Sequence, residues 1–358
     1  RDFCLSRGLG DVYKRQASNR DSSRFRMNFT EDYPFSKISS LRTTETASFF
    51  CELSDINQID EIVSFSKEKN LPILIIGEGT NIVPTKTFQG LVVFNKLLGI
   101  KEIDNMSIEV ASGENWHDFV EWTLRHKMFG LENLALIPGT VGAGPIQNIG
   151  AYGSEISSNI KKITCFNLKT DSIKVLYANE CEFGYRTSIF KDCSDYIILS
   201  VTFQFKTDPK INYSYSSLED EINENNINKD NLTHRDIFDL VSKIRKKVLP
   251  DYKEFPNVGS FFKNVVLTKE EFSKLDITEE IPVYLEGDDI KISAAFLIEK
   301  FGWKGFREGS VGISDQHALV LVTYEETPGD EILKFSNKII NQIFSITGIK
   351  LEIEPTLI

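Results

Sequence analysis

Three side chains in this sequence are suited to binding a carboxylate and moving protons beside it. Arg186 lies in FGYRTSIFK, where aromatic and β-branched neighbours would desolvate a guanidinium that can grip a carboxylate bidentately. Ser260 follows a glycine in PNVGSFFKN. Glu354 stands between Ile353 and Pro355 in an apolar closing segment, where burial would raise the pKa of its carboxyl. A locally paired arginine, a turn serine and a solvent-facing glutamate explain the same patterns, so both interpretations stay open.

Other common mechanisms lack the residue spacings that they need. Nothing of the GxSxG kind surrounds Ser260, so a nucleophile-elbow hydrolase is not supported. The four histidines are scattered and show no HExxH spacing, so we predict no metal site. The five cysteines are widely spaced and form no CxxC pair, which favours reduced thiols over a zinc knuckle or a disulfide framework.

Two glycine-rich segments could let backbone amides approach a phosphate group. GEGTN, residues 77–81, lacks the third glycine of GxGxxG and the lysine of a P-loop, so an ordinary turn explains it equally well. PGTVGAGPIQNIGAYG, residues 138–153, contains five glycines, two prolines and no acidic side chain. An ordered loop of that length is usually functional, and amides facing a diphosphate would explain its composition.

The elements that must position these residues follow from hydrophobic periodicity. Residues 56–70 predict a helix, followed by buried strands at 71–77 and 90–95 in a small α/β unit. Short β-like runs between Ile100 and Phe205, with a helix at residues 116–126, predict an α+β domain built around an antiparallel sheet. The glycine-rich segment 138–153 is predicted to be a long loop of that domain.

The second half of the chain begins with a polar, Asn-rich stretch at residues 221–231. A helix is predicted over residues 234–248, ending where Leu249-Pro250 would stop it. We expect β-like runs at 259–266 and 317–324, helices at 293–301 and 331–347, and a closing strand at 350–358 that returns to an earlier domain.

Composition narrows the class of protein. The 41 basic and 52 acidic residues give a net charge of -11, which disfavours a nucleic-acid partner. No run approaches the roughly 18 apolar residues of a membrane span, and no secretory pattern is visible, so we expect a soluble cytoplasmic protein. CLSRGLGDVYKRQ, residues 4–16, resembles translated sequencing-adaptor read-through. We therefore expect residues 1–26 to be a non-native leader and exclude them from the fold prediction.

Several motifs, taken in order, closely resemble the UDP-N-acetylenolpyruvoylglucosamine reductase family from Met27 to Ile358. They are GEGTN, GENWHDFVEWTL, GLENLALIPGTVGAGPIQNIGAYGSE, FGYRTSIFK, NVGSFFKN, SAAFLIEKFGWKG, QHALVLV and EPTLI. The resemblance implies a fold of the vanillyl-alcohol-oxidase type, with two α+β FAD-binding subdomains and a smaller C-terminal α+β substrate domain. We expect the first subdomain at 27–98 joined by 346–358, the second at 99–245 and the substrate domain at 246–345.

The resemblance also implies an activity. NADPH would reduce FAD, and hydride would then reach the enolpyruvyl ether of UDP-N-acetylglucosamine and yield UDP-N-acetylmuramate for peptidoglycan, and so for cell wall biogenesis, cell shape and division. Arg186 and Glu354 would stabilise the charge that develops beside the carboxylate, and Ser260 would donate a proton, helped by Lys263 or a bound water. The enzyme is expected to be a monomer.

The binding residues implied by the family fall into two groups. The predicted cofactor-binding residues are Gly77, Glu78, Gly79, Thr80, Asn81, Pro138, Gly139, Thr140, Gly142, Ala143, Gln147, Asn148, Gly150, Ala151 and Tyr152. The predicted substrate-binding residues are Tyr215, Arg245, Lys263, Asn264 and Lys291. Of the substrate group, Tyr215 is placed by a motif, whereas Arg245, Lys263 and Lys291 are inferred from their charge.

The sequence departs from the family pattern at three places. Val248 stands where Lys is common before Leu-Pro, Val265 follows Lys-Asn where Pro is usual, and Ser39-Ser40-Leu41 replaces an Asn-Thr-Phe-like start. The first departure affects the expected diphosphate contacts, although a shift of the helix end could bring in a neighbouring lysine. Two alternatives remain: an FAD-dependent alcohol or hydroxy-acid oxidase of the same fold, and a flavin-binding protein without turnover.

Overall fold

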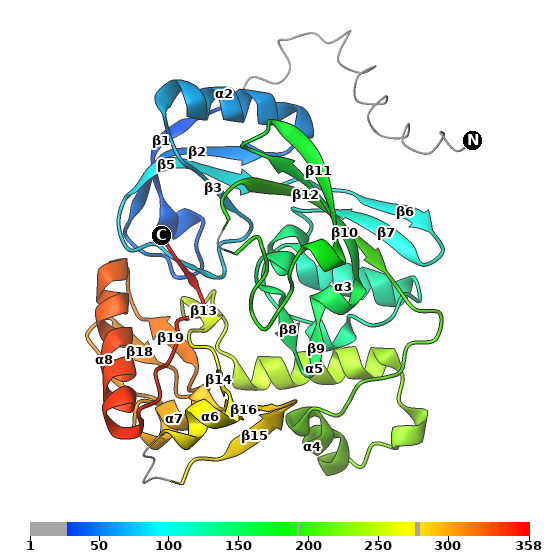
Figure 1. Ribbon diagram of the computed structural model, residues 1–358, viewed down its shortest axis with the longest axis vertical. Coiled ribbons are helices and arrows are strands. Elements are labelled where there is room, and N and C mark those ends of the chain that lie inside the picture. The colour runs from blue at the N-terminus through cyan, green and yellow to red at the C-terminus, as the bar shows by residue number, and fades with distance from the viewer. Residues whose placement is uncertain (1–26, 192, 276–279) are drawn as a thin grey trace.

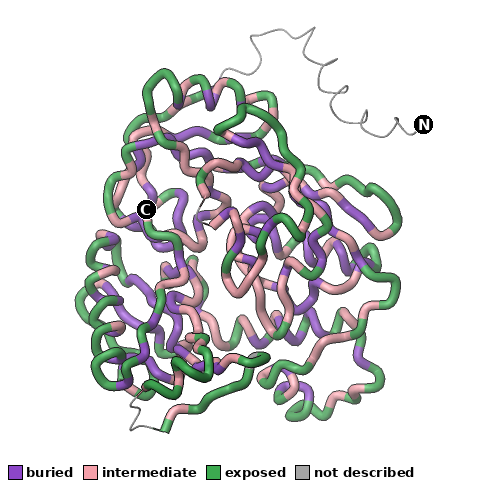
Figure 2. Tube along the Cα trace, viewed as in Figure 1, coloured by how far each residue is buried: buried purple, intermediate pink, exposed green. Residues whose placement is uncertain are grey.

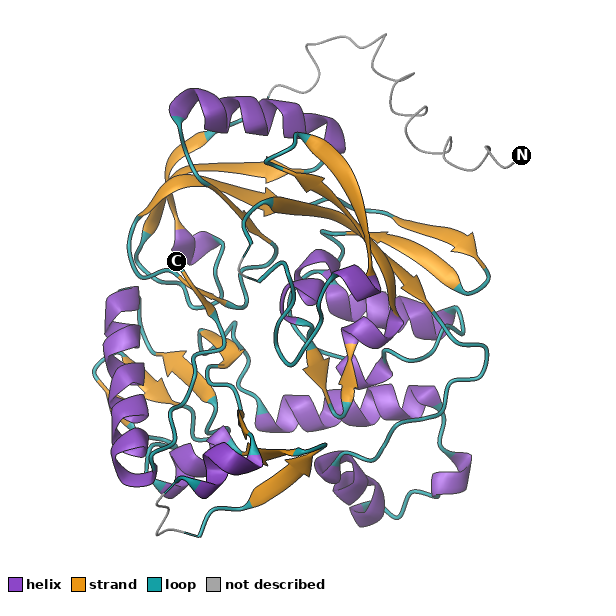
Figure 3. Ribbon diagram, viewed as in Figure 1, coloured by secondary structure: helices purple, strands orange, loops and turns teal. Residues whose placement is uncertain are grey.

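The structure is a computed structural model that describes residues 27–191, 193–275 and 280–358 (Figure 1). The expected leader, residues 1–26, lies outside the described residues. In the described ranges, no helix has the length and apolar character needed to cross a membrane. The longest strands gather in two neighbouring sheets in the upper part, with one helix above them and the other helices and shorter strands below (Figure 3).

The first sheet has the strand order β1-β2-β5-β3. Its strands are β1 (Thr30–Pro34), β2 (Thr46–Leu53), β3 (Ile73–Ile76) and β5 (Phe88–Asn95). β5 pairs in parallel with both β2 and β3, whereas β1 pairs antiparallel to β2. Helix α2 (Ile59–Lys69) buries Ile59, Ile62 and Val63 on one face and ends at Asn70 in the left-handed conformation.

The second sheet is antiparallel with the order β11-β10-β12-β7-β6, which agrees with the predicted antiparallel domain. Its strands are β6 (Ile100–Asp104), β7 (Ser107–Ala111), β10 (Ile160–Asn167), β11 (Ser172–Tyr177) and β12 (Tyr196–Gln204). Helix α3 (Trp116–Arg125) packs Trp116 and Phe119 against Phe203 of β12. Figure 2 shows buried segments along the middle strands and exposure at the outer hairpins.

The glycine-rich segment is more regular than the long loop that the sequence predicted. A 3-10 helix, Val141–Gln147, holds Pro145 inside it, and a small hairpin of β8 (Gly150–Ala151) and β9 (Ser154–Glu155) follows. Asn148 ends the 3-10 helix in the left-handed conformation. The prediction failed because glycine and proline suppress helix propensity, while the short hydrogen-bonded turns here are supported by the surrounding fold.

The polar stretch at residues 221–231, for which the sequence analysis predicted no element, begins inside a helix. Helix α4 (Ser216–Glu224) covers part of it and buries Leu218 and Ile222, which lie four residues apart on one face. Helix α5 (His234–Val248) begins at Thr233, whose side chain and that of Asp236 form a capping box. It ends directly before Leu249-Pro250, as predicted.

Among the described residues of the C-terminal part, two small sheets pack against three helices. One sheet has the order β13-β19-β18-β17 and the other β14-β16-β15. Their strands are β13 (Asn257–Ser260), β14 (Val265–Leu267), β15 (Val283–Glu286), β16 (Asp289–Ile292), β17 (Arg307–Glu308), β18 (Val311–Ile313) and β19 (Val320–Thr323). The helices are α6 (Lys269–Ser273), α7 (Ala294–Lys300) and α8 (Gly329–Thr347).

The predicted β-like run at 259–266 is divided between β13 and β14. Phe261 and Phe262 between them are fully buried, and the Phe261 N–H donates to the carbonyl of Leu319 at 2.7 Å. The chain therefore leaves one sheet and enters the other at this point. A short β-like run in the sequence does not reveal such a change of sheet, because the partner strands lie far away in the chain.

The C-terminal residues return to the first part of the chain. β20 (Thr356–Leu357) pairs in parallel with β4 (Ile82–Val83), next to the 77–81 turn. The closing segment passes upward between the C-terminal helices and the first sheet (Figure 1). The expected strand over 350–358 is thus reduced to β20 and a single bridge between Ile353 and Phe262.

Candidate active site

A cavity of about 440 Å³ opens where the two larger sheets meet. Its wall contains β3, the 77–81 turn and the 3-10 helix Val141–Gln147. Ten predicted cofactor-binding residues line it: Gly77, Glu78, Gly79, Thr80, Asn81, Pro138, Thr140, Gly142, Ala143 and Gln147. The other five predicted residues are outside the lining set: Gly139, Asn148, Gly150, Ala151 and Tyr152.

Two glycines of this wall stand where a side chain would collide with a neighbouring segment of the chain. A Cβ added at Gly79, which has φ 62°, would lie 1.9 Å from the carbonyl oxygen of Ile38. A Cβ added at Gly142 would lie 2.4 Å from the Cβ of Ser112. Glycine is therefore required by close packing of the chain around the cavity.

Glu78 joins the two glycine-rich segments. One carboxylate oxygen accepts a hydrogen bond from Asn115 Nδ2 at 2.8 Å, and the other accepts one from the Gly139 N–H at 3.0 Å. Asn115 also caps α3 by accepting from the Asp118 N–H at 3.1 Å. This carboxylate thus holds the wall together, and its contact with a cofactor stays a prediction.

The residues of the cavity wall fit a flavin dinucleotide. β3 and Trp116 supply apolar surface for an aromatic ring system, and the glycine turns expose backbone to a diphosphate. Lys191 is the one Lys or Arg among the described lining residues. The buried hydroxyl of Ser112 on this wall has no hydrogen-bond partner among the described residues, so a polar ligand atom could satisfy it.

Arg186 and Glu354 meet beside the cavity. Arg186 Nε lies 3.4 Å from Glu354 Oε1, and the two side chains are 19% and 12% exposed. Arg186 Nη2 donates to the carbonyl of Gly150 at 2.7 Å. Lys191 Nζ donates to the main-chain oxygens of Arg186 at 3.4 Å and Glu354 at 3.2 Å. The hairpin of the glycine-rich segment therefore supports the guanidinium, and Lys191 joins the two backbones.

Loss of water is the strongest electrostatic influence on the Glu354 carboxyl. Burial raises the pKa of Glu354 above its ordinary value. The charges of Arg186, Lys191 and Lys263 oppose this shift but are smaller influences than the loss of water. A carboxyl with a raised pKa can donate a hydrogen bond or a proton near neutral pH.

Ser260 lies on a segment that runs beside Glu354. The Glu354 N–H donates to the carbonyl of Phe261 at 3.0 Å, and the Lys263 N–H donates to the carbonyl of Glu352 at 3.0 Å. Gly259 before Ser260 has φ 72°, and its N–H donates to Asn257 Oδ1 at 2.9 Å. Ser260 is half-buried at this bend, so the three predicted catalytic residues come from separate parts of the chain to one region.

Two of the predicted substrate-binding residues flank Tyr152. Tyr215 packs edge-on against the Tyr152 ring at 5.5 Å, and it is 47% exposed. Arg245 of α5 is also close enough to Tyr152 to influence its pKa, which burial raises. The Nε of Arg245 is buried and has no hydrogen-bond partner among the described residues. An unsatisfied guanidinium of this kind suits an anionic ligand.

The other three lie in the C-terminal part. Lys263 pairs with Glu352 at 3.2 Å, and Asn264 Oδ1 accepts from the Ala294 N–H at 3.1 Å at the start of α7. Lys291 Nζ stands 5.0 Å from the centre of the Tyr185 ring. The Arg186 guanidinium contacts the same ring at 5.2 Å, so Tyr185 links the small β14-β16-β15 sheet to the Arg186 loop.

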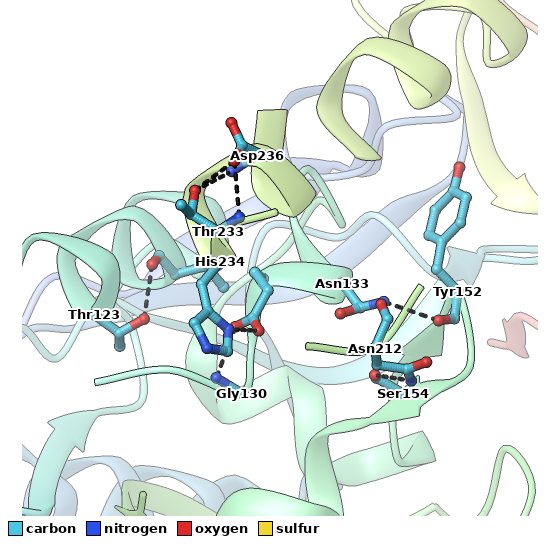
Figure 4. A network of polar contacts seen from close by, with 11 residues as sticks. Thr123, Gly130, Asn133, Tyr152, Ser154, Asn212, Thr233, His234 and Asp236 are labelled. Carbon is cyan, nitrogen blue, oxygen red and sulfur yellow. Dashed lines mark hydrogen bonds and ion pairs between the residues drawn. The ribbon is translucent and has the colours of Figure 1, made fainter. Parts of the chain in front are cut away.

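A polar network under the glycine-rich hairpin was missed by sequence reasoning (Figure 4). Asn133 Nδ2 donates to the carbonyls of Tyr152 at 3.0 Å and Asn212 at 2.9 Å. Glu132, which is 3% exposed, accepts from the Gly130 N–H at 2.7 Å and contacts His234 of α5. The signal was present as a polar pair inside the apolar run GLENLALIPG. The network ties the hairpin and α5 to one support.

The helix end at Val248 shows no shift that would replace the missing lysine. α5 continues through Val248, which packs against the core that contains Trp116 and Phe203. Lys246 and Lys247 stay exposed on the helix surface. Sequence reasoning also passed over Phe190 and Lys191, which line the cavity although they belong to the same FGYRTSIFK motif. Among the described residues, no cluster of His, Cys, Asp and Glu could hold a metal ion.

Comparison with known proteins identifies the class to which this fold and cavity belong. The family described as FAD binding domain matches residues 47–170, and the family described as UDP-N-acetylenolpyruvoylglucosamine reductase, C-terminal domain, matches residues 250–358. The protein is therefore an FAD-dependent oxidoreductase of α+β fold. The predicted FAD-binding α+β fold is confirmed.

Relatives extend over most of the chain. UDP-N-acetylenolpyruvoylglucosamine reductase from Flavobacterium johnsoniae is 41% identical, covering 85% of this chain and 92% of its own length. The reductase of that name from Burkholderia lata is 36% identical, covering 92% of this chain and 97% of its own length. The chain belongs to the UDP-N-acetylenolpyruvoylglucosamine reductase family, which confirms the resemblance found in its motifs.

A solved structure shares the fold. The UDP-N-acetylenolpyruvylglucosamine reductase from Thermus caldophilus superposes with a TM-score of 0.64, covering 93% of this chain and 98% of that chain. Its sequence identity is 19%, so this likeness concerns the fold.

Proposed function

We propose that this protein reduces the enolpyruvyl ether of UDP-N-acetylglucosamine to UDP-N-acetylmuramate, with FAD as cofactor and NADPH as co-substrate. Family membership supports the reaction, and the buried Arg186–Glu354 pair beside the cavity is the observation that carries it. The product serves peptidoglycan precursor synthesis, and so cell wall growth, cell shape and division. We place the reaction in the cytoplasm, where NADPH and UDP-sugars are made, and propose a monomeric enzyme.

We assign FAD binding and UDP-sugar binding to different parts of the chain. Residues 27–98 with 346–358 and residues 99–245 would hold FAD, because the 77–81 turn and the 138–153 segment line one cavity from the two sides. Residues 246–345 would bind the UDP-sugar. The hydrophobic core around Phe261, Leu297 and Phe335, to which Leu41 and Val83 also contribute, supports this third unit.

Hydride transfer to the double bond of the enol ether is the chemistry that bound FAD supplies after its reduction by NADPH. Addition at the terminal carbon leaves negative charge on the carbon beside the substrate carboxylate. Arg186 would bind that carboxylate, and a neutral Glu354 would donate a hydrogen bond to the enolate-like charge as it develops. Lys191 bridges the two residues through their backbone oxygens.

Ser260 would protonate the carbon beside the carboxylate after hydride addition. The segment that carries it is hydrogen-bonded to the main chain of Glu354, which supports a place for Ser260 on the same side of the substrate. A serine hydroxyl is a weak acid, and Lys263 nearby or a bound water would return the proton to it.

The nucleotide part of the substrate would lie along α5 and the Tyr152 hairpin. Tyr215 offers an exposed aromatic face for the uracil, and Arg245 offers a buried guanidinium for the diphosphate. Lys263, Asn264 and Lys291 would approach the sugar from the C-terminal sheets. Val248 packs into the core and offers no charge to the diphosphate. Arg245 would therefore interact with more of the diphosphate charge here than in a protein with lysine at position 248.

The test is an anaerobic stopped-flow experiment on protein that starts at Met27. Flavin absorbance should bleach after NADPH is added and return when the enolpyruvyl UDP-sugar is added. In Ser260→Ala the first step should be retained, while the second slows by about two orders of magnitude or more, the scale of a lost proton transfer. Ser345→Ala, at an exposed serine of α8, serves as the matched control and should behave as the unchanged enzyme.

Other outcomes would reject the proposal. Bleaching that is reversed by oxygen alone would favour the oxidase alternative, and flavin that NADPH never reduces would favour a binding protein without turnover. Unchanged turnover of Ser260→Ala would remove the proton-donor role from that residue.

A further inference from the structure

Two N–H groups converge on one oxygen of the Glu354 carboxyl. Arg186 Nε lies 3.4 Å from Oε1, and Gln147 Nε2 donates to the same Oε1 at 3.3 Å. A guanidinium can donate hydrogen bonds but cannot accept them. Oε1 therefore acts as the acceptor at this contact, whatever the protonation state of the carboxyl.

The donor character of Arg186 also sets the orientation of two amides. Because Gln147 directs its NH2 group at Oε1, its carbonyl oxygen faces the other way and accepts from Asn81 Nδ2 at 2.6 Å. The two hydrogen bonds form one directed series from Asn81 through Gln147 to Glu354. The reverse orientation would require Glu354 to point a proton from Oε1 at Gln147, on the oxygen that already faces the Arg186 N–H.

Both amides stand at places that can hold Glu354 still. Asn81 ends the 77–81 turn, and its main-chain oxygen accepts from the Thr356 N–H at 3.0 Å, which ties the segment carrying Glu354 to this turn. Gln147 is the last residue of the 3-10 helix in the glycine-rich segment. Asn81 and Gln147 both line the 440 Å³ cavity.

We propose that Asn81 and Gln147 are positioning residues that keep Oε1 of Glu354 as an acceptor and so place the carboxyl proton on Oε2. The raised pKa of Glu354 favours the protonated form of this carboxyl. Oε2 is then the oxygen that donates to the substrate. This role in catalysis rests on the proposed function, whereas the position of the proton can be measured without substrate.

The experiment is an infrared pH titration of the FAD-loaded enzyme in the absence of NADPH and substrate. The C=O band of the protonated carboxyl is assigned by its loss in Glu354→Gln. In Gln147→Met, which keeps the chain length but removes the donor, the band should move to higher wavenumber because the carbonyl oxygen loses a hydrogen bond. The pH at which the band disappears should rise, because the lost donor had favoured the ionised form.

Asn81→Leu provides the independent arm, because it leaves Gln147 and Glu354 in place. It should shift the band in the same direction, since an amide released from Asn81 no longer holds its NH2 group toward Oε1. The double variant should shift the band no further than Gln147→Met alone, because the two residues act in series. Asn81→Ser, whose side chain is too short to reach Gln147, replaces Asn81→Leu if that variant does not fold.

The outcomes separate this inference from the proposed function. A band that stays unmoved in Gln147→Met, or shifts that add in the double variant, would overturn the series. If the band shifts as expected but the enzyme never reduces the UDP-sugar, the hydrogen-bond series from Asn81 to Glu354 is supported and the proposed reaction is rejected. In an active enzyme, Gln147→Met should slow flavin reoxidation by substrate roughly tenfold, the scale of one lost hydrogen bond.

Discussion

Replacing Gly142 by alanine should loosen the wall of the flavin cavity. The Gly142 N–H donates to the carbonyl of Ser112 at 2.8 Å, so the two chains are already in close contact. An added Cβ would lie 2.4 Å from the Ser112 Cβ and 3.0 Å from both its Cα and its carbonyl oxygen. Most of these atoms belong to backbone, which cannot turn aside, so the chains must separate.

The size of the effect follows from that separation. Forcing one extra carbon into a packed site typically costs about 1–3 kcal/mol, and the weakened hydrogen bond adds about 1 kcal/mol. We expect urea unfolding of the FAD-free protein to show this loss of stability. FAD affinity is measured by the recovery of flavin fluorescence on dilution. It should fall about tenfold for each 1.4 kcal/mol of binding free energy that is spent on restoring the packed wall.

Two further variants test the reasoning. In Gly144→Ala the new Cβ would meet the end of the flexible Ile156 side chain at 2.6 Å, so its effect should be smaller. Combining Gly142→Ala with Ser112→Gly removes the atom at 2.4 Å and should recover part of the loss in a double-mutant cycle. If Gly142→Ala has the urea stability and FAD affinity of the unchanged protein, close packing at Gly142 does not support the wall. A double variant that is no more stable than Gly142→Ala alone would show the same.

Two other predictions concern ionisable groups. The raised pKa of Glu354 contributes stability that is complete below the pKa of the unfolded chain and is lost as pH rises through the folded value. Glu354→Gln should therefore gain stability relative to the unchanged FAD-free protein as pH rises from 4.5 to 8 in urea unfolding, and a constant difference would contradict this. Iodoacetamide should alkylate Cys193 before Cys51 and Cys165, because burial raises the pKa of the latter two to about 12, and FAD should protect Cys193, which lines the cavity. Mass spectrometry of tryptic peptides, with and without FAD, measures both rates.

Elements whose signals are local could be read from the sequence. α2 and α5 have apolar residues at helical spacing together with capping residues at their ends, and these signals need no distant partner. The family motifs were equally visible, because residues 138–153 combine glycine and proline in an unusual way. α4 was missed because its few apolar positions are surrounded by polar residues, and its buried face exists only against neighbouring elements.

The sequence alone determined the fold class, the family and the residues proposed for catalysis. The tertiary structure decided how they are arranged. Glu78 proved to join two segments, and the 259–266 run proved to divide between two sheets. Gln147 lies 66 residues from Asn81 and 207 from Glu354, yet it contacts both. Periodicity reports on neighbours along the chain, whereas the burial and hydrogen bonds that tune a carboxyl come from segments that only folding brings together.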